Sequence, residues 1–212
     1  MGSPLRQISG PVGPLEVLLD LPTGLPRAAV VFAHPLPTHG GTMHTKVVFQ
    51  AAKALARIGC VVLRFNFRGV GLSAGVWDEG RGEKEDYAAA LTHMAGAYPG
   101  LEIWAAGFSF GSYIATTVGA DDDRVCALIA IAPPVHAYEF ASMKLSLKPK
   151  FLIHGGHDEL ISIRFARRFY AELPEPKEFI EIDSADHVFD GHTTEVGDAL
   201  AGLLEDFSCK TQ

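Results

Sequence analysis

The stretch LEIWAAGFSFGSYIATTV, residues 101–118, decides the fold. It opens with an apolar run, Leu101 to Ala106, that is typical of a buried strand. The G-x-S-x-G turn that follows has a glycine on each side, where a cramped backbone leaves no room for a side chain, and the residues after it can form a helix. This context predicts a nucleophile elbow with Ser109 at its apex. The alternative is a glycine-bounded turn whose serine caps the following helix.

Composition restricts the classes of protein that this chain can belong to. Its 212 residues, 48% hydrophobic and 20% charged, fit one globular domain spanning 1–212. A net charge of -7 argues against a nucleic-acid partner, which usually selects a basic surface. The longest apolar stretch, 125–132, is far shorter than the roughly 20 residues of a membrane span, so we expect no membrane partner either.

The start of the chain and its cysteines indicate a cytoplasmic protein. The start, MGSPLRQISG, lacks the basic and then apolar regions of a secretory signal. Cys60 and Cys126 lie in apolar, strand-like runs, and Cys209 lies in a polar tail. Because an odd number of cysteines fits poorly with a disulfide framework, we expect three free, reduced thiols.

Strands and helices alternate from residue 28 to the end of the chain. This pattern predicts an α/β fold with a mostly parallel sheet and helices on both faces, in which ligands bind at the carboxyl ends of the strands. The expected strands cover residues 5–9 and 15–21 as a hairpin, then 28–33, 60–67, 101–106, 125–131, 151–154 and 179–182. The expected helices cover residues 46–58, 83–97, the segment after the elbow, 162–172 and 194–207, while 135–149 is irregular.

A serine nucleophile needs an imidazole to take its proton and a carboxylate to orient that imidazole. Asp158 and His187 each follow a predicted strand, in HGGHDEL and SADHVF, and they come after Ser109 in the order that this fold uses. We therefore predict a Ser109, Asp158, His187 triad. The rival acids are Glu159, Asp183 and Asp186, and Asp158 would otherwise cap the helix that begins near Ser162.

The remaining histidines of this region have structural interpretations. His154, at a strand end, is expected to pack against the following glycine turn, and His157 and His192 to lie in a loop or at a helix cap. His154, His157, Asp158 and His187 together resemble a metal cluster, but no tight spacing such as H-E-x-x-H is present. We predict neither a metal nor a cofactor.

The oxyanion of a tetrahedral intermediate needs two preorganised donors. The backbone N–H of Phe110, directly after the nucleophile, is one candidate. The other is the N–H of Leu36, in the HPLPTHGG loop that follows the strand 28–33. The same loop can also be a rigid proline-rich turn, and both interpretations can hold at once.

Two further groups of residues lie near the predicted site. We expect Arg68 and Asn66 to hold neighbouring loops rather than to touch a substrate. Aromatic residues near strand ends can line the pocket or belong to the core: Phe108, Phe110, Trp77, His136, Tyr138 and Phe140. The short segment 132–149 leaves such a pocket open.

With these motifs the chain resembles the α/β-hydrolase superfamily, and within it the small cap-less bacterial serine hydrolases grouped near dienelactone hydrolase. The resemblance runs through HPLPTHGGTMHTKVVFQAAKALARIG, VVLRFNFRGVGLSAG, GFSFG, HGGHDEL and ADHVF. It implies Ser109, Asp158 and His187 as the triad, with Leu36 and Phe110 as the oxyanion hole. Such relatives usually carry H-P-H-P where this chain has Leu36 as the third residue, and dienelactone hydrolase itself uses cysteine as its nucleophile.

The expected function is therefore a cofactor-independent serine hydrolase that cleaves a small carboxylic ester or thioester through an acyl-enzyme intermediate. A serine peptidase or amidase would use the same triad. A ligand-binding protein that keeps the fold but has little turnover is the third possibility. The expected partner is a small acyl substrate, and no pattern in the chain indicates an oligomeric state.

Overall fold

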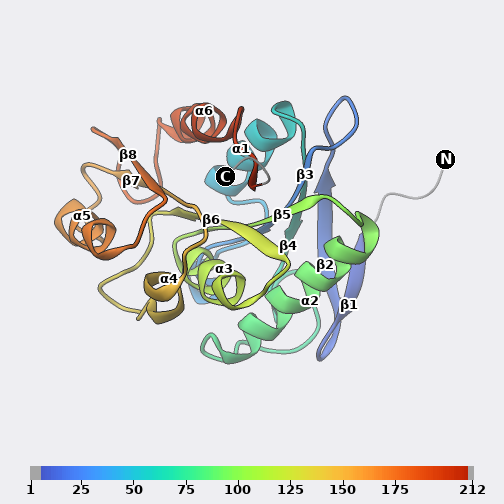
Figure 1. The fold of residues 1–212 in the computed structure, drawn as a ribbon. Helices are drawn as coiled ribbons and strands as arrows, with labels where there is room; N and C mark the ends of the chain where they lie inside the picture. Colours follow the sequence, from blue (N-terminus) through green and yellow to red (C-terminus); the bar gives the residue numbers. More distant parts are fainter. Residues whose placement is uncertain (1–5, 210–212) are drawn as a thin grey trace.

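A computed structural model describes residues 6–209 and arranges them around one eight-stranded sheet (Figure 1). The strand order is β1-β2-β4-β3-β5-β6-β7-β8. β1 and β2 form an antiparallel hairpin and β2 pairs antiparallel with β4, whereas all later pairings are parallel. The strands are β1 Gln7–Gly10, β2 Gly13–Asp20, β3 Ala28–Ala33, β4 Cys60–Phe65, β5 Glu102–Phe108, β6 Val125–Ile131, β7 Lys150–Gly155 and β8 Lys177–Ile182.

Helices cover both faces of the sheet, which confirms the predicted fold class. The α-helices are α1 Lys46–Arg57, α2 Arg81–Ala97, α3 Phe110–Asp121, α4 Ala141–Leu145, α5 Ile163–Glu172 and α6 Thr193–Leu204. Figure 1 shows α1 and α6 on one face and α2, α3 and α4 on the other. Successive residues of a strand point to opposite faces, so Val31 packs with Tyr87 of α2 while Val30 packs with Val48 of α1 in a second core cluster.

Most element boundaries follow the sequence pattern. The strands 28–33 and 125–131 have the predicted bounds because both are continuous apolar runs buried on both faces. The predicted hairpin is present as β1 and β2, with Leu5 outside the described residues. Within the stretch predicted to be irregular, residues 141–145 form the short helix α4.

The prediction for the last helix was wrong at its C-terminal end. α6 ends at Leu204, three residues before Phe207. Phe207 leaves the helix and packs its ring 5.4 Å from that of Trp104 and 4.9 Å from that of Phe151. Phe207 is therefore partly buried, against the sheet and not along the face of a helix.

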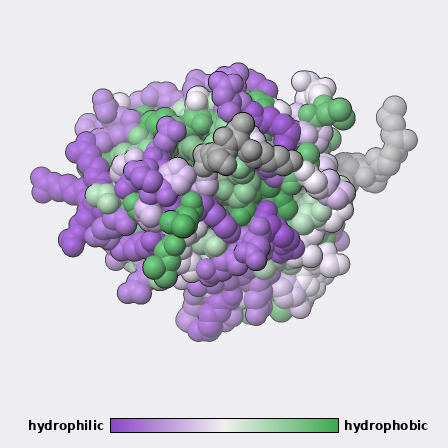
Figure 2. Space-filling model, viewed as in Figure 1, coloured by the Kyte–Doolittle hydropathy of each residue, from purple (hydrophilic) through white to green (hydrophobic). Residues whose placement is uncertain are grey.

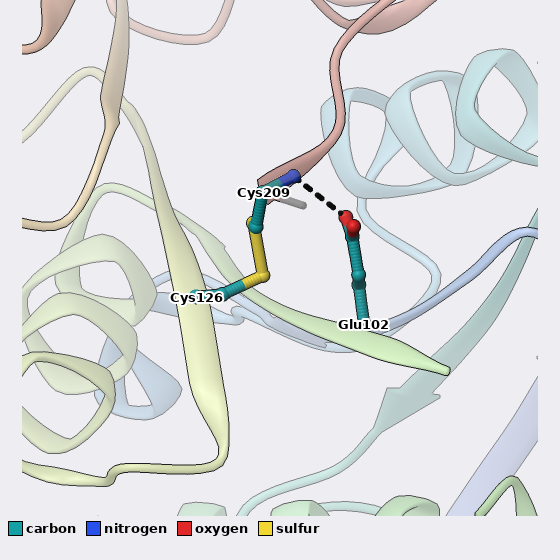
Figure 3. A group of neighbouring side chains, drawn as sticks. All are labelled: Glu102, Cys126 and Cys209. Atoms are coloured by element: carbon teal, nitrogen blue, oxygen red, sulfur yellow. Dashed lines mark hydrogen bonds between the residues drawn. A yellow bond between two sulfur atoms is a disulfide. The ribbon is translucent and has the colours of Figure 1, made fainter. Parts of the chain in front are cut away.

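The cysteine prediction was also wrong, because Cys126 and Cys209 form a disulfide with their Cα atoms 6.1 Å apart (Figure 3). The C-terminal segment crosses the amino ends of β5 and β6, where Glu102 accepts a hydrogen bond from the Cys209 N–H at 3.1 Å. Cys60 is free and buried, and burial raises the pKa of its thiol to about 12. That thiol is therefore unreactive at neutral pH.

Across residues 6–209, no helix is long and apolar enough to cross a bilayer. On the side of the molecule that carries the C-terminal segment, hydrophilic residues cover most of the surface, with hydrophobic residues in smaller groups between them (Figure 2). The first five residues, which contribute to the prediction of no secretory signal, lie outside the described part of the chain.

Candidate active site

Ser109 lies at a sharp turn between β5 and α3, as predicted. Its backbone adopts φ 52° and ψ -122°, a strained conformation for a residue with a side chain. The Ser109 N–H donates to the Ile131 carbonyl of β6 at 2.8 Å, and the Ser109 carbonyl accepts from Ser112 N–H at 2.8 Å. These bonds hold the strained turn in place, so the serine is the apex of an elbow and not only a helix cap.

The two glycines of the elbow are required by close packing. A Cβ on Gly107 would lie 2.2 Å from the Gly111 carbonyl oxygen, and a Cβ on Gly111 would lie 2.4 Å from the Ala33 carbonyl oxygen. Real side chains do not approach that closely, so only glycine fits at either position. The G-x-S-x-G spacing thus follows from how tightly α3 packs against β3 and β5.

The structure brings the three predicted side chains together. Ser109 Oγ lies 3.0 Å from Nε2 of His187, and Nδ1 of His187 lies 2.8 Å from Oδ2 of Asp158. A carboxylate can only accept, so Nδ1 carries the hydrogen and Nε2 is left to accept the proton of the Ser109 hydroxyl. These contacts match those of a Ser-His-Asp triad.

The Asp158 carboxylate is buried but remains ionised. Burial by itself would raise the pKa of Asp158, but the hydrogen bond from His187 and the backbone N–H of Ile161 outweigh it and hold the pKa below its usual value. Its Oδ1 accepts the N–H groups of Leu160 and Ile161, at 2.9 and 2.7 Å. The charge that orients His187 is thus present at neutral pH.

The loops that carry Asp158 and His187 meet through a pair of glycines. A Cβ on Gly155 would lie 2.4 Å from the Ala185 carbonyl oxygen, and one on Gly156 would lie 2.3 Å from the Asp183 carbonyl oxygen. Any larger residue would push the loop after β7 away from the loop after β8. The sequence analysis did not assign this role, although the adjacent glycines before Asp158 were a readable signal.

The loop after β3 places Leu36 beside the elbow, where both residues line one cavity. The Leu36 carbonyl accepts the N–H groups of His39 and Gly41, each at 3.1 Å, which folds the loop into a compact turn. Among residues 6–209, the Leu36 N–H has no hydrogen-bond acceptor. The Phe110 N–H starts α3, where helical N–H groups have no partner within the helix. Both N–H groups therefore remain candidates for the oxyanion hole.

His34 anchors this loop, a role that the sequence analysis missed. Its Nε2 accepts the Phe67 N–H at 3.1 Å, so its Nδ1 carries the hydrogen and donates to the Pro35 carbonyl at 2.6 Å. Burial lowers the pKa of His34 to about 4, although the bond to Pro35 opposes the shift. The ring is thus neutral, and it ties the loop of Leu36 to the chain that follows β4.

The rival acids and histidines have other surroundings. Glu159 and Asp183 are exposed, and Oδ1 of Asp186 accepts the N–H of Asp190 at 2.9 Å. The cap of α5 is Ser162, whose hydroxyl accepts the Arg164 N–H. His157 is exposed in its loop, and His192 precedes α6 with its Nδ1 2.7 Å from Glu195 Oε1.

Arg68 and Asn66 hold neighbouring segments by hydrogen bonds. Of the described partners of these side chains only Met43 lies in a loop, since Asp86 belongs to α2 and Glu16 to β2. The Arg68 guanidinium donates to both oxygens of the buried Asp86 carboxylate, with Nη2 at 2.9 Å from Oδ1 and Nε at 3.0 Å from Oδ2. Asn66 Oδ1 accepts the Met43 N–H at 2.9 Å, and Asn66 Nδ2 donates to Glu16 at 2.8 Å. Neither residue lines the cavity beside Ser109.

A cavity of about 490 Å³ opens directly over Ser109 and His187. The loop 35–41 forms one wall, the segment 134–138 another, and Leu160, Ile161 and Val188 a third. Of the predicted aromatic residues, Phe108, Phe110, His136 and Tyr138 line it, whereas Trp77 packs on Phe110 and Phe140 is buried against Tyr113. No Asp, Glu, Lys or Arg is among the described residues that line it.

Another groove and another cluster of polar residues lie away from Ser109, His187 and Asp158. A larger groove of about 630 Å³ lies between α1 and α6, but none of the triad residues lines it. Within the described chain, the residues close enough to share a metal ion are Glu102, Cys126 and Cys209, at the opposite ends of the strands. Their two sulfur atoms are bonded to each other.

The chain is similar in sequence to a known protein family and to an uncharacterized protein. Residues 24–148 match the model of a family described as serine aminopeptidase, S33. Over 210 residues the chain is 34% identical to an uncharacterized protein of Rickettsia prowazekii (strain Madrid E), an alignment that covers 95% of this chain and 88% of that protein.

The similar solved structures include two that match nearly the whole chain. One is an α/β serine hydrolase homologue from Coxiella burnetii, with a TM-score of 0.89, 41% identity and coverage of 93% of this chain and 95% of that one. The other is a Xanthomonas campestris protein described as a member of the α/β serine hydrolases without a lid. It has a TM-score of 0.87, 35% identity and coverage of 94% and 92%.

Proposed function

Because this chain belongs to the α/β-hydrolase superfamily, in the family described as serine aminopeptidase, S33, we propose that it is a cofactor-independent serine hydrolase that cleaves a small carboxylic ester or thioester. Ser109 is the proposed nucleophile, His187 the general base and acid, and Asp158 the residue that orients His187. The narrower likeness to dienelactone hydrolase remains a prediction, with the serine nucleophile as the clearest departure from it.

The reaction proceeds in two halves. His187 Nε2 takes the proton of Ser109 as Oγ attacks the acyl carbon, and the N–H groups of Leu36 and Phe110 hold the resulting oxyanion. The imidazolium of His187 then protonates the leaving oxygen or sulfur, and an acyl-serine forms. A water molecule gives a proton to His187 and attacks the acyl carbon, which releases the acid and restores Ser109.

The observation that carries this proposal is the continuous chain of contacts from Ser109 Oγ through His187 to Asp158, at 3.0 and 2.8 Å, opening into a cavity. Its volume of about 490 Å³ suits a small acyl compound. Burial keeps water away from Asp158, whose side chain has no exposed area.

The charge of the cavity favours an ester over the substrate of an aminopeptidase. An aminopeptidase must hold the free α-ammonium of its substrate, and a buried cation needs a carboxylate partner. None of the described residues lining the cavity is Asp or Glu. Walls without a carboxylate fit an uncharged acyl group, and an alkoxide or thiolate leaves more readily than the anion of an amine, which must be protonated before it can leave.

An activity-based probe tests the nucleophile. A fluorophosphonate should label the native protein and fail to label Ser109→Ala. Ser112→Ala is the matched control, because Ser112 lies one helical turn away with its hydroxyl bonded to the Ser109 carbonyl, and it should label normally. Absence of labelling on folded native protein would contradict the proposal.

Paired substrates separate the alternatives. Rates on nitrophenyl esters and on anilides with the same acyl group should favour the ester by a wide margin. A higher rate on the anilide would favour the peptidase or amidase reading. Tight binding of a small acyl compound without turnover by either class would instead favour a ligand-binding protein.

The proposal also includes a cytoplasmic location. Because the cytoplasm usually keeps thiols reduced, the Cys126–Cys209 disulfide argues against this location, and a direct test is needed. Fractionation of intact cells followed by immunoblotting should find the protein with cytoplasmic markers. Recovery of the protein outside the cytoplasmic fraction would contradict this location.

A further inference from the structure

His154 lies directly behind the catalytic Asp158, although the proposed reaction does not use it. It occupies the end of β7, pairs in register with Glu181 of β8, and has no exposed side-chain area. The sequence analysis expected it to pack against the glycine turn. A fully buried imidazole needs hydrogen-bond partners, so its contacts are informative.

The contacts of His154 fix its protonation. Nε2 lies 2.8 Å from the Ile161 carbonyl oxygen and 3.4 Å from Asp158 Oδ2. Both oxygens accept, so Nε2 carries the hydrogen, and Nδ1 is a buried lone pair with no partner in the described chain. Burial lowers the pKa of His154, against the opposing effects of Ile161 and Asp158, so the ring is neutral at pH 7.

The hydrogen bond from His154 to the Ile161 carbonyl closes a short turn around the Asp158 carboxylate. The Ile161 N–H donates to Asp158 Oδ1 at 2.7 Å, and the Ile161 carbonyl accepts from His154. Ile161 is thereby held at both its backbone groups, one by the carboxylate and one by the histidine. Rotation of the Asp158 side chain would break the first bond, and release of Ile161 would permit that rotation.

The remaining oxygen, Oδ2, faces two imidazoles. His187 Nδ1–H donates to it at 2.8 Å. His154 Nε2, whose hydrogen is donated to the Ile161 carbonyl, lies 3.4 Å from it, too far for a strong hydrogen bond but close enough for electrostatic attraction. We propose that His154 is a positioning residue: it fixes Asp158 toward His187 and partly balances the carboxylate charge that His187 experiences. This inference rests on the proposed hydrolase function.

The test compares three substitutions by their pH profiles. His154→Met fills the space but removes the N–H, whereas the amide of His154→Gln can place a donor near the position of Nε2. His157→Gln is the matched control on an exposed neighbour. The other charged groups near His154 are Glu181 and its partner Arg167, which stay constant in all three variants.

The expected result has two parts. His154→Met lowers kcat on a nitrophenyl ester roughly tenfold, a fraction of what a positioned base contributes, with KM within about twofold. Because the Asp158 charge is then less balanced, it stabilises the imidazolium more, and the acidic limb of kcat/KM moves up by roughly half a pH unit. His154→Gln recovers most of both effects, and His157→Gln matches the native protein.

Two results would overturn the inference. One is a folded His154→Met with native kcat and an unmoved acidic limb. The other is an equal loss of kcat in His154→Met and His154→Gln without movement of the limb, which would indicate only a packing role. If His154→Met does not fold, His154→Asn replaces it, because that shorter amide does not reach the Ile161 carbonyl.

A readout without turnover separates this inference from the proposed function. In Ser109→Ala, the low-field proton resonance of the His187 Nδ1–H reports the bond to Asp158. Adding His154→Met should shift or broaden this resonance, and an unchanged resonance would contradict the inference. Native esterase rates in Ser109→Ala would instead contradict the proposed nucleophile while leaving this measurement valid.

Discussion

The two ends of the parallel strands use polar side chains in opposite ways. At the amino ends, Glu102 accepts hydrogen bonds from Ser208 and Cys209, and the guanidinium of Arg27 donates to the carbonyls of Leu204, Glu205 and Phe207. The Cys126–Cys209 bridge lies in the same place. These groups use one another as partners, and together they fasten the C-terminal segment to the sheet.

At the carboxyl ends, some polar groups are buried and fully hydrogen-bonded, and others line a cavity. His34 and Asp158 are buried and held by backbone groups, whereas Ser109 and Leu36 line the cavity. A cluster of polar residues is therefore a candidate site where its buried members have all their hydrogen bonds and its reactive atoms remain accessible from a cavity. The predictions below test that distinction.

The largest effect should come from Ser109→Gly. Turnover should fall by more than about 10⁴-fold, because the nucleophile is removed. The free energy of unfolding should stay equal or rise by about 1 kcal/mol, since glycine relieves the strain at φ 52°. Ester hydrolysis and urea denaturation measure the two quantities. A variant that is clearly less stable than the native protein would contradict the idea that strain is stored at this end.

Asp158→Asn should be nearly as damaging to activity. The amide can donate to Nδ1 of His187 and favour the wrong tautomer, so kcat should fall roughly 10⁴-fold. Asp183→Asn is the control, because this rival acid is exposed and should behave like the native protein. Steady-state kinetics on one ester give kcat for both variants and for the native protein. A loss of less than about tenfold would mean that another acid orients His187.

Loss of the disulfide should affect stability and spare activity. Cys126→Ser with Cys209→Ser opens a loop of 83 residues and should lower the free energy of unfolding by about 2–4 kcal/mol. The value of kcat at 25 °C should stay within about twofold, because the bridge lies at the ends of the strands away from the cavity. A reducing agent should destabilise the native protein in urea denaturation and leave the double variant unaffected. A large loss of kcat in folded double variant would remove the contrast between the two ends.

The smallest predicted effect concerns the neutral His34. Its pKa is about 4 in the folded protein against 6.5 in the unfolded chain, so between these values only the unfolded chain binds the proton. The contribution of the neutral His34 to the free energy of unfolding is therefore fully present above pH 6.5 and is lost as the pH falls toward 4. About 2 kcal/mol is lost from pH 7 to pH 5.

The check is urea denaturation at both pH values. His34→Gln, which cannot titrate, should lose less stability than the native protein over the same interval. An identical loss in the two proteins would show that the His34 ring is not held neutral.

The sequence predicted what depends on local pattern and on fixed chain order. The run 125–131 is a strand in the structure because its apolar residues must be buried on both faces. Ser109, Asp158 and His187 were named from a turn motif and from their positions after strands, and they lie in mutual contact. Each of these inferences needs only neighbouring residues and the general layout of a parallel sheet.

The sequence could not predict contacts between segments far apart in the chain. Cys209 appeared to be a polar-tail thiol because nothing near it indicates that Cys126 lies alongside. Phe207 continues the helical spacing of Leu200 and Leu204, and only the position of Trp104 explains why it leaves the helix. The neutral state of His34 likewise depends on Phe67, which is brought close by the fold.

The position of β8 in the sheet has one further consequence. His187 follows the outermost strand, which pairs with β7 on one side and has no strand on the other within the described chain. Such a strand is secured by a single ladder of hydrogen bonds, so it can fray while the central strands stay paired. The loop that carries His187 can then move away from Ser109 in a molecule that is still largely native. On heating, activity should therefore be lost at a lower temperature than the temperature at which the whole fold melts.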